Sequence, residues 1–200
     1  IGVAVTIEFI GPLSLAAALS RRWLDAVAVA AAAAGVVLIS EALSTPFADL
    51  EKTGIALALL AGAFWAAYIV LAGRTGGEFP KLEGLALAMV VATVVTLPLG
   101  ITSAPSWSPD ILLKAFGIAV LSSVLPYSLE LLALRRLSAK VFGILLSLEP
   151  AFAALAGLLV LGQVLSPTQL VGMALVVAAS ALVLGLGARQ RPDPAEAAST

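Results

Sequence analysis

Apolar runs of about 20 residues, separated by short polar connections, fill most of this 200-residue chain. About 20 helical residues are needed to cross the hydrocarbon core of a bilayer, because each adds about 1.5 Å. The runs are continuous and do not alternate with polar residues, which argues against a transmembrane β-barrel. We therefore predict seven membrane-spanning helices, at Ile1–Leu19, Leu24–Ile39, Gly54–Gly73, Leu82–Ile101, Ile111–Leu134, Val141–Leu161 and Leu170–Gly187.

The composition supports a membrane protein. Hydrophobic residues make up 61% of the chain and charged residues 12%, and the mean hydropathy is +1.11. Soluble domains contain about 45–50% apolar and about 25% charged residues. The predicted fold class is thus an all-α, polytopic transmembrane helix bundle.

The sequence has no Cys and no His. Their absence removes disulfides, thiol nucleophiles, imidazole bases and the usual ligands of zinc, haem and iron–sulfur clusters. We expect no cofactor, no metal site and no enzymatic activity. The net charge of -1 gives no support for nucleic-acid binding, and in a membrane protein the distribution of charge is more informative than its sum.

Lys and Arg alternate between the two sides of the predicted bundle. On one side the only basic residues are Lys52, in the connection after the second predicted span, and Lys114, near the start of the fifth predicted span. The other connections and the C-terminal segment contain Arg21 and Arg22, Arg74 and Lys81, Arg135, Arg136 and Lys140, and Arg189 and Arg191. Connections rich in Lys and Arg stay in the cytoplasm. We therefore predict a cytoplasmic C-terminus, with residues 188–200 as a disordered cytoplasmic tail.

Two proline-containing segments of the chain are similar. Aligning Pro12 in EFIGPLSLAAAL with Pro150 in SLEPAFAALAGLL brings their Ala- and Leu-rich tails into register. We interpret residues 1–39 as the last two helices of one repeat and residues 54–187 as a complete second repeat of five helices. Three further helices would then precede the chain. An odd-numbered repeat gives its two copies opposite orientations in the membrane, as in many secondary transporters.

The stretch LSSVLPYSLELLALRRLSAKVFGILLSLEPAFAALAGLLVLGQ resembles the EamA-type drug/metabolite transporter superfamily, and most of all its inner-membrane threonine and homoserine exporters. The resemblance rests on Pro126, Tyr127 and Glu130, the Arg135–Arg136 pair, and the segment 143–150. It implies ten transmembrane helices in two inverted five-helix repeats, which export small metabolites such as amino acids in exchange for protons. The chain departs from this pattern by its smaller number of spans and by Gln163, where an acidic residue often follows the LG of this segment.

Three acidic residues fall inside predicted spans: Glu8, Glu130 and Glu149. A charged side chain at the centre of a membrane helix costs roughly 2.5–3.5 kcal/mol on insertion scales, so such residues usually face the bundle interior. A carboxyl group removed from water holds its proton more tightly and could exchange it near neutrality. We predict that these acids bind protons or a substrate ammonium group. The alternative is that each acid is structural and pairs with a neighbouring group.

Polar and aromatic side chains share helix faces with these acids. In a regular helix, Ser123, Pro126 and Tyr127 lie on the same face as Glu130. On the third predicted span Trp65 and Tyr68 share a face and offer an aromatic surface to an apolar group or a cation. The alternative for the two aromatic residues is packing within the bundle or at an interface.

Prolines interrupt three of the predicted spans. Pro12, Pro126 and Pro150 each lack a backbone donor, which would leave the carbonyl four residues earlier unpaired. Those carbonyls belong to Glu8, Ser122 and Leu146. We predict kinks or hinges at these prolines, although proline in a membrane helix is often only a packing feature.

The sequence thus predicts a secondary transporter of the bacterial inner membrane that exports amino acids or similar metabolites by proton-coupled alternating access. Its expected partners are a small-molecule substrate, protons and the lipid bilayer, and a homodimer is left open. One alternative is a non-transporting structural subunit, in which the acids join helices. Another is a membrane-embedded enzyme acting on lipid-linked substrates, but the polar or metal-binding loop cluster expected of it is missing from the sequence.

Overall fold

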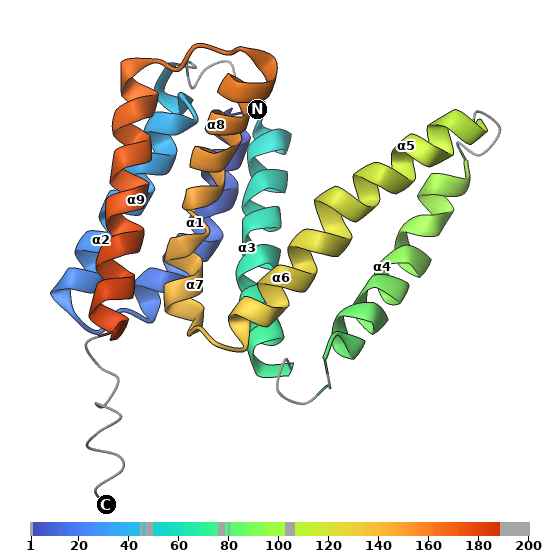
Figure 1. Cartoon of the computed structure of the whole chain (residues 1–200), viewed down its shortest axis with the longest axis horizontal. Helices are drawn as coiled ribbons and strands as arrows, with labels where there is room; N and C mark the ends of the chain where they lie inside the picture. Colours follow the sequence, from blue (N-terminus) through green and yellow to red (C-terminus); the bar gives the residue numbers. More distant parts are fainter. Residues whose placement is uncertain are drawn as a thin grey trace, which may run out of the picture. The chain divides into compact units, whose positions relative to one another are not determined.

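The computed structural model describes residues 2–44, 46, 50–75, 79, 81–102 and 107–188. All regular structure in these residues is helical, which confirms the predicted fold class. The elements (Figure 1) are α1 (Gly2–Ala18), α2 (Trp23–Ile39), η1 (Ala42–Ser44), α3 (Lys52–Thr75), α4 (Glu83–Ile101), α5 (Pro109–Ala119), η4 (Val120–Val124), α6 (Leu125–Leu134), α7 (Ala139–Leu145), α8 (Leu148–Leu161) and α9 (Pro167–Ala188). The predicted tail began at Ala188, which is the last residue of α9, and the rest of that tail, with its arginines at 189 and 191, lies outside the described residues.

The helices coincide with the seven predicted spans. Among the residues that the structure describes, five segments are long and apolar enough to cross a membrane: Lys52–Arg74, Glu83–Ile101, Pro109–Leu134, Ala139–Leu161 and Pro167–Gly185. The apolar helices α1 and α2 are shorter, at 17 residues each. The fifth and sixth spans are not continuous α-helices. The fifth contains the π-helical turn η4, and the sixth is interrupted between α7 and α8.

The chain divides into two compact units, each described here by itself. Unit 1 comprises Ile1–Ile69 and Ala139–Thr200, and unit 2 comprises Val70–Ser138. In unit 1, α2 and α9 pack antiparallel along much of their length (Figure 1). A methyl group added at Gly35 or at Gly172 would lie 2.8 Å from the carbonyl oxygen of the other residue. The two backbones therefore approach one another at a point where only glycine fits.

The start of α9 is fixed by hydrogen bonds within its own first turn. The Gln169 backbone N–H donates to Ser166 Oγ at 3.3 Å, and the Ser166 backbone N–H donates to Gln169 Oε1 at 2.9 Å. This reciprocal arrangement is a capping box, which satisfies donors that the helix leaves unpaired. Gln169 Nε2 also donates to the Ile39 carbonyl at 3.3 Å, so the same residue connects the beginning of α9 to the end of α2.

Helix α1 packs closely against both α3 and α7 in unit 1. Gly11 and Gly62 face one another, and a methyl group at Gly62 would lie 2.6 Å from the Glu8 carbonyl oxygen. A methyl group at Gly143 on α7 would lie 2.8 Å from the Pro12 carbonyl oxygen. Small residues allow this kind of close approach between membrane helices. These contacts bring the middle of α1 beside the interrupted span that contains Glu149.

In unit 2, α5, η4 and α6 follow one another as a single long segment. Ser108 caps α5 by accepting a hydrogen bond from the Ile111 N–H at 3.3 Å. Beyond the end of α6, the Arg135 guanidinium donates to the carbonyls of Phe79, at 2.8 Å, and Lys81. This arginine therefore ties the end of α6 to the connection that precedes α4.

Candidate functional site

The structure places two of the three predicted acids within electrostatic range of one another in unit 1. Glu8 lies on α1 and Glu149 lies in the first turn of α8. Their carboxylates are close enough to interact electrostatically. Two like charges near one another repel, so the two carboxylates destabilise one another in their charged forms.

The pair is open on one side. Glu8 is half-buried, whereas Glu149 is exposed, because Pro150 and Ala151 occupy the buried face at the start of α8. We expected an acid at this depth to face the bundle interior, but the described helices alone do not enclose it.

An aromatic contact joins α1 to α3 at the residue that follows Glu8. Trp65 on α3 meets Phe9 on α1 edge to face, with ring centroids 5.0 Å apart and an interplanar angle of 70°. Phe9 is buried, and Trp65 and Tyr68 are half-buried, with the Tyr68 hydroxyl oxygen in the interior. The aromatic contact therefore holds α3 against the part of α1 that contains Glu8. Unit 1 thus contains four of the predicted site residues: Glu8, Glu149, Trp65 and Tyr68.

The interruption next to Pro150 corrects one expectation. We predicted that Pro150 leaves the Leu146 carbonyl unpaired, but this carbonyl accepts a hydrogen bond from the Glu149 N–H at 2.9 Å. The chain turns at Leu146 and Ser147, and the tighter turn supplies the donor that proline lacks. Ser147 is fully buried there and donates to the Ile144 carbonyl at 2.6 Å. The span is therefore interrupted three residues before the proline, at a turn that hydrogen bonds stabilise.

The other two prolines differ from Pro150. Helix α1 continues through Pro12, and the Glu8 carbonyl that precedes it faces Gly62 on α3. Before Pro126 the helix widens into the π turn η4, where the Leu125 N–H donates to the Val120 carbonyl. π-turns inside α-helices are frequent at functional sites.

The remaining predicted residues lie in unit 2. Pro126, Tyr127 and Glu130 belong to α6, so their spacing of three and four residues is that of a regular helix. Ser123 lies in the π turn, where the regular spacing assumed for it does not apply. Glu130 is half-buried with Oε2 in the interior, and Tyr127 is 37% exposed.

A buried ion pair was not predicted from the sequence. Lys140 Nζ on α7 lies 2.8 Å from Asp25 Oδ2 on α2, and the two side chains are 25% and 3% exposed. The Arg21 backbone N–H donates to the same carboxylate oxygen at 3.4 Å. The sequence did contain one indication of this pair: an acid just inside one predicted span and a lysine just before another. Both residues lie on the side of the membrane assigned to the basic connections.

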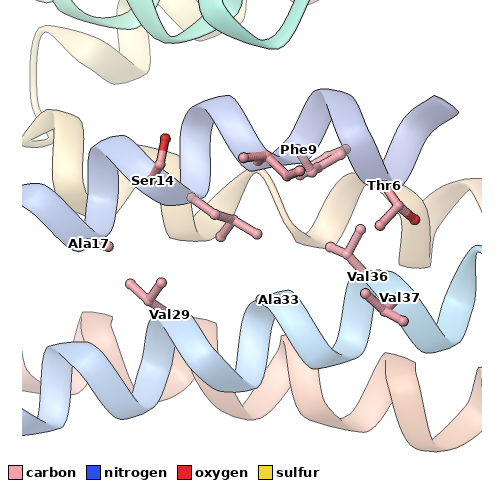
Figure 2. A pocket seen from close by; sticks show the side chains of 10 residues that line it. Thr6, Phe9, Ser14, Ala17, Val29, Ala33, Val36 and Val37 are labelled. Atoms are coloured by element: carbon pink, nitrogen blue, oxygen red, sulfur yellow. The ribbon is translucent and has the colours of Figure 1, made fainter. Parts of the chain in front are cut away.

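A pocket of about 280 Å³ lies between α1 and α2 (Figure 2). Its wall is mostly apolar, from residues such as Phe9 and Val36, with the hydroxyl groups of Thr6 and Ser14 at its edge. Thr6 Oγ1 lies 2.5 Å from Ser40 Oγ, and Ser14 Oγ donates to the Gly11 carbonyl at 2.9 Å. Both hydroxyl groups are thus hydrogen-bonded within the chain. Among the described residues, no group of three or more acidic side chains could hold a metal ion.

Comparison with known proteins relates most of these apolar helices to one family. Residues 52–185 match the EamA-like transporter family over most of the described helices. The chain belongs to this family. It is therefore a multi-pass membrane protein, and the curated relatives that it matches are transporters.

Two curated relatives of this EamA-like chain are the threonine/homoserine exporters RhtA of Escherichia coli strain K12 and Salmonella typhimurium strain LT2. Each is 40% identical over 182 residues, which cover 90% of this chain and 61% of the relative. The chain thus spans less than two thirds of the length of these relatives. No solved structure matches it.

Proposed function

We propose that this chain forms part of a secondary transporter that exports small metabolites, such as threonine or homoserine, across the bacterial inner membrane. The proposal is supported by the similarity to the RhtA exporters and by family membership. The single observation that carries the mechanism is the proximity of Glu8 and Glu149, which come from different helices. In this proposal the C-terminus is cytoplasmic, and transport proceeds by proton-coupled alternating access.

The acid pair suits both tasks that amino-acid export requires. A zwitterionic substrate brings an ammonium group, and a gradient-driven exporter must also bind and release a proton. Because the two carboxylates repel one another, binding of either cation relieves the repulsion. The substrate and the proton would therefore compete for the pair, and this competition couples their movements in opposite directions.

Other residues complete the proposed pathway. Trp65 and Tyr68 would provide the surface for the uncharged part of the substrate, and Glu130, Tyr127 and Ser123 would form polar binding positions in unit 2. Residues 1–39 and 54–187 are proposed to be parts of two inverted repeats. The antiparallel packing of α2 and α9 is what such a repeat requires. Further helices, corresponding to the length of the relatives that this chain does not span, would cover the exposed side of Glu149.

Efflux from proteoliposomes tests the proposal. Proteoliposomes that contain the intact protein, its Glu149→Gln variant or its Glu8→Gln variant would be loaded with radiolabelled threonine. Efflux would be measured with and without an imposed pH gradient. Hydrogen bonds to charged groups contribute about 1.5–3 kcal/mol, so we expect each variant to lower proton-driven efflux about tenfold or more. Glu83→Gln, which changes an exposed acid in the first turn of α4, is the matched control and should leave efflux unchanged.

The result also separates the transporter from a structural subunit. If both carboxyl groups only join helices, the glutamine variants should retain full proton-driven efflux, provided that they fold. That outcome would contradict the role of the acid pair. Absence of threonine and homoserine efflux from the unmodified protein would contradict the proposed substrates.

A further inference from the structure

The Asp25–Lys140 ion pair connects two elements that are far apart in the sequence. Asp25 lies in the first turn of α2, Lys140 follows the first residue of α7, and 115 positions separate them. Asp25 is almost completely buried, whereas the lysine side chain is a quarter exposed. The pair therefore lies at the end of unit 1 where α1 turns into α2, next to Arg21 and Arg22.

The carboxylate also holds the connection between α1 and α2. The Arg21 N–H donates to the same Asp25 oxygen that binds the lysine. Nearby, Ser20 Oγ donates to the Ala16 carbonyl at 2.7 Å and closes the last turn of α1. One buried carboxylate thus joins the α1–α2 connection, the beginning of α2 and the beginning of α7.

The two helices joined by this pair differ in length and in their packing partners. Helix α2 is fixed along its length by α9, through the close contact at Gly35 and Gly172 and the Gln169–Ile39 hydrogen bond. Helix α7 has only seven residues and ends at the turn of Leu146 and Ser147. A short helix that ends at a turn can tilt without moving the whole span. Because Gly143 of α7 packs closely against Pro12 of α1, a tilt of α7 would pivot about this contact and be taken up at the turn.

Helix α7 also connects the ion pair to the acid pair. Its length is about 10 Å, at about 1.5 Å per residue. Lys140 is at one end, and the turn leading to Glu149 is at the other. Gly143, between them, contacts the Pro12 carbonyl on α1. A tilt of α7 that separates Lys140 from Asp25 would also shift the turn that positions Glu149.

We propose that Asp25 and Lys140 form a latch, which closes the Arg21–Arg22 end of unit 1 and opens during transport to let α7 tilt. This inference rests on the proposed transport function. The partial exposure of Lys140 allows water to reach the charges as they separate, which lowers the cost of opening relative to a fully enclosed pair. A static support is the alternative, and it predicts general loosening when the pair is removed.

Cysteine labelling distinguishes the two cases without measuring transport. These 200 residues contain no Cys, so Ser20→Cys and Ser40→Cys each give a single thiol once any cysteine elsewhere in the intact protein is replaced by serine. Both serines are half-buried; Ser20 lies at the latch end, and Ser40 follows the opposite end of α2. Each single-cysteine protein would be prepared with and without the Asp25→Asn substitution and placed in lipid nanodiscs, which expose both faces of the membrane. The rate of labelling by a water-soluble maleimide would then be measured.

We expect Asp25→Asn to increase the labelling rate of the thiol at position 20 about fivefold or more, the usual lower range of coupling between conformational states. The rate at position 40 should stay the same or fall. Lys140→Gln should behave like Asp25→Asn, and Lys140→Arg, which keeps the charge, should behave like the unmodified protein.

An unchanged rate at position 20, or equal increases at both positions, would overturn the latch. If the labelling rates follow the expected pattern but the protein does not export threonine or homoserine, the latch is supported. Only the proposed substrates are then contradicted. A Lys140→Arg variant that labels as fast as Lys140→Gln would also overturn the proposal, because charge would then not hold the end closed.

Discussion

The contact between α1 and α3 permits a direct test of the packing described for unit 1. A methyl group added at Gly11 would overlap the Gly62 carbonyl oxygen and lie 2.5 Å from its carbonyl carbon. Ordinary van der Waals contact begins at 3.4 Å, so Gly11→Ala must push the two helices apart by about 1 Å. A gap of this size removes a quarter to a half of the dispersion energy of the contacts it opens.

The expected free-energy change follows from two opposing effects. Overfilling a packed site costs about 1–3 kcal/mol, whereas replacing glycine by alanine within a helix gains about 0.5–1 kcal/mol. We expect Gly11→Ala to lower the free energy of unfolding by about 1–2 kcal/mol. Gly73→Ala is the control, because it adds the same methyl group to α3 with no atom within 4 Å. It should be neutral or stabilising by about 0.5–1 kcal/mol.

Reversible unfolding by SDS in mixed micelles measures both variants. Fluorescence of Trp65 gives a second observation, after Trp23 and Trp107 are replaced by Phe, because separation of α1 and α3 weakens the Phe9–Trp65 contact. Equal stability of Gly11→Ala and Gly73→Ala, with unchanged Trp65 emission, would refute the close approach of these helices.

The same unfolding assay checks three further predictions. Gly172→Ala should destabilise the protein by about 1–3 kcal/mol, because the added methyl group would lie 2.8 Å from the Gly35 carbonyl oxygen. Gly185→Ala on the same helix should be tolerated, because its added methyl group would have no atom within 4 Å. Ser166→Ala should cost about 1 kcal/mol, through loss of the cap on α9; an unchanged midpoint would argue against the capping box. Ser180→Ala should be neutral or stabilising by up to roughly 1 kcal/mol, because the buried Ser180 hydroxyl has no hydrogen-bond partner among the described residues. A clear loss of stability would show that this hydroxyl has a partner.

The spans could be predicted from the sequence because hydrophobic length is a local property. Every predicted span overlaps a helix, and the proline at 150 indicated an irregular sixth span. The position of the interruption was less predictable. It depends on where the chain can replace the missing hydrogen bond, and the Glu149 N–H supplies that bond to the Leu146 carbonyl.

Other features depend on contacts that periodicity does not encode. The face assigned to Ser123 assumed 3.6 residues per turn, but the π turn at Val120–Val124 changes the spacing before Pro126. The partnership of Asp25 with Lys140 was not predicted, because each residue by itself resembles an ordinary interfacial charge. The proximity of Glu8 and Glu149 was not predicted, although each residue was assigned to proton or substrate binding by itself.

The dependence of α2 on α9 has a consequence for biogenesis. Helix α2 consists largely of alanine and valine, and its buried residues include Ala28, Ala32 and Gly35. Alanine has little affinity for lipid, so this segment gains its stability mainly from a partner helix. That partner is synthesised late, since Ile39 and Gln169 are 130 residues apart. We expect a nascent chain released before α9 emerges from the ribosome to retain α2 poorly in the bilayer and to become a substrate for membrane proteases.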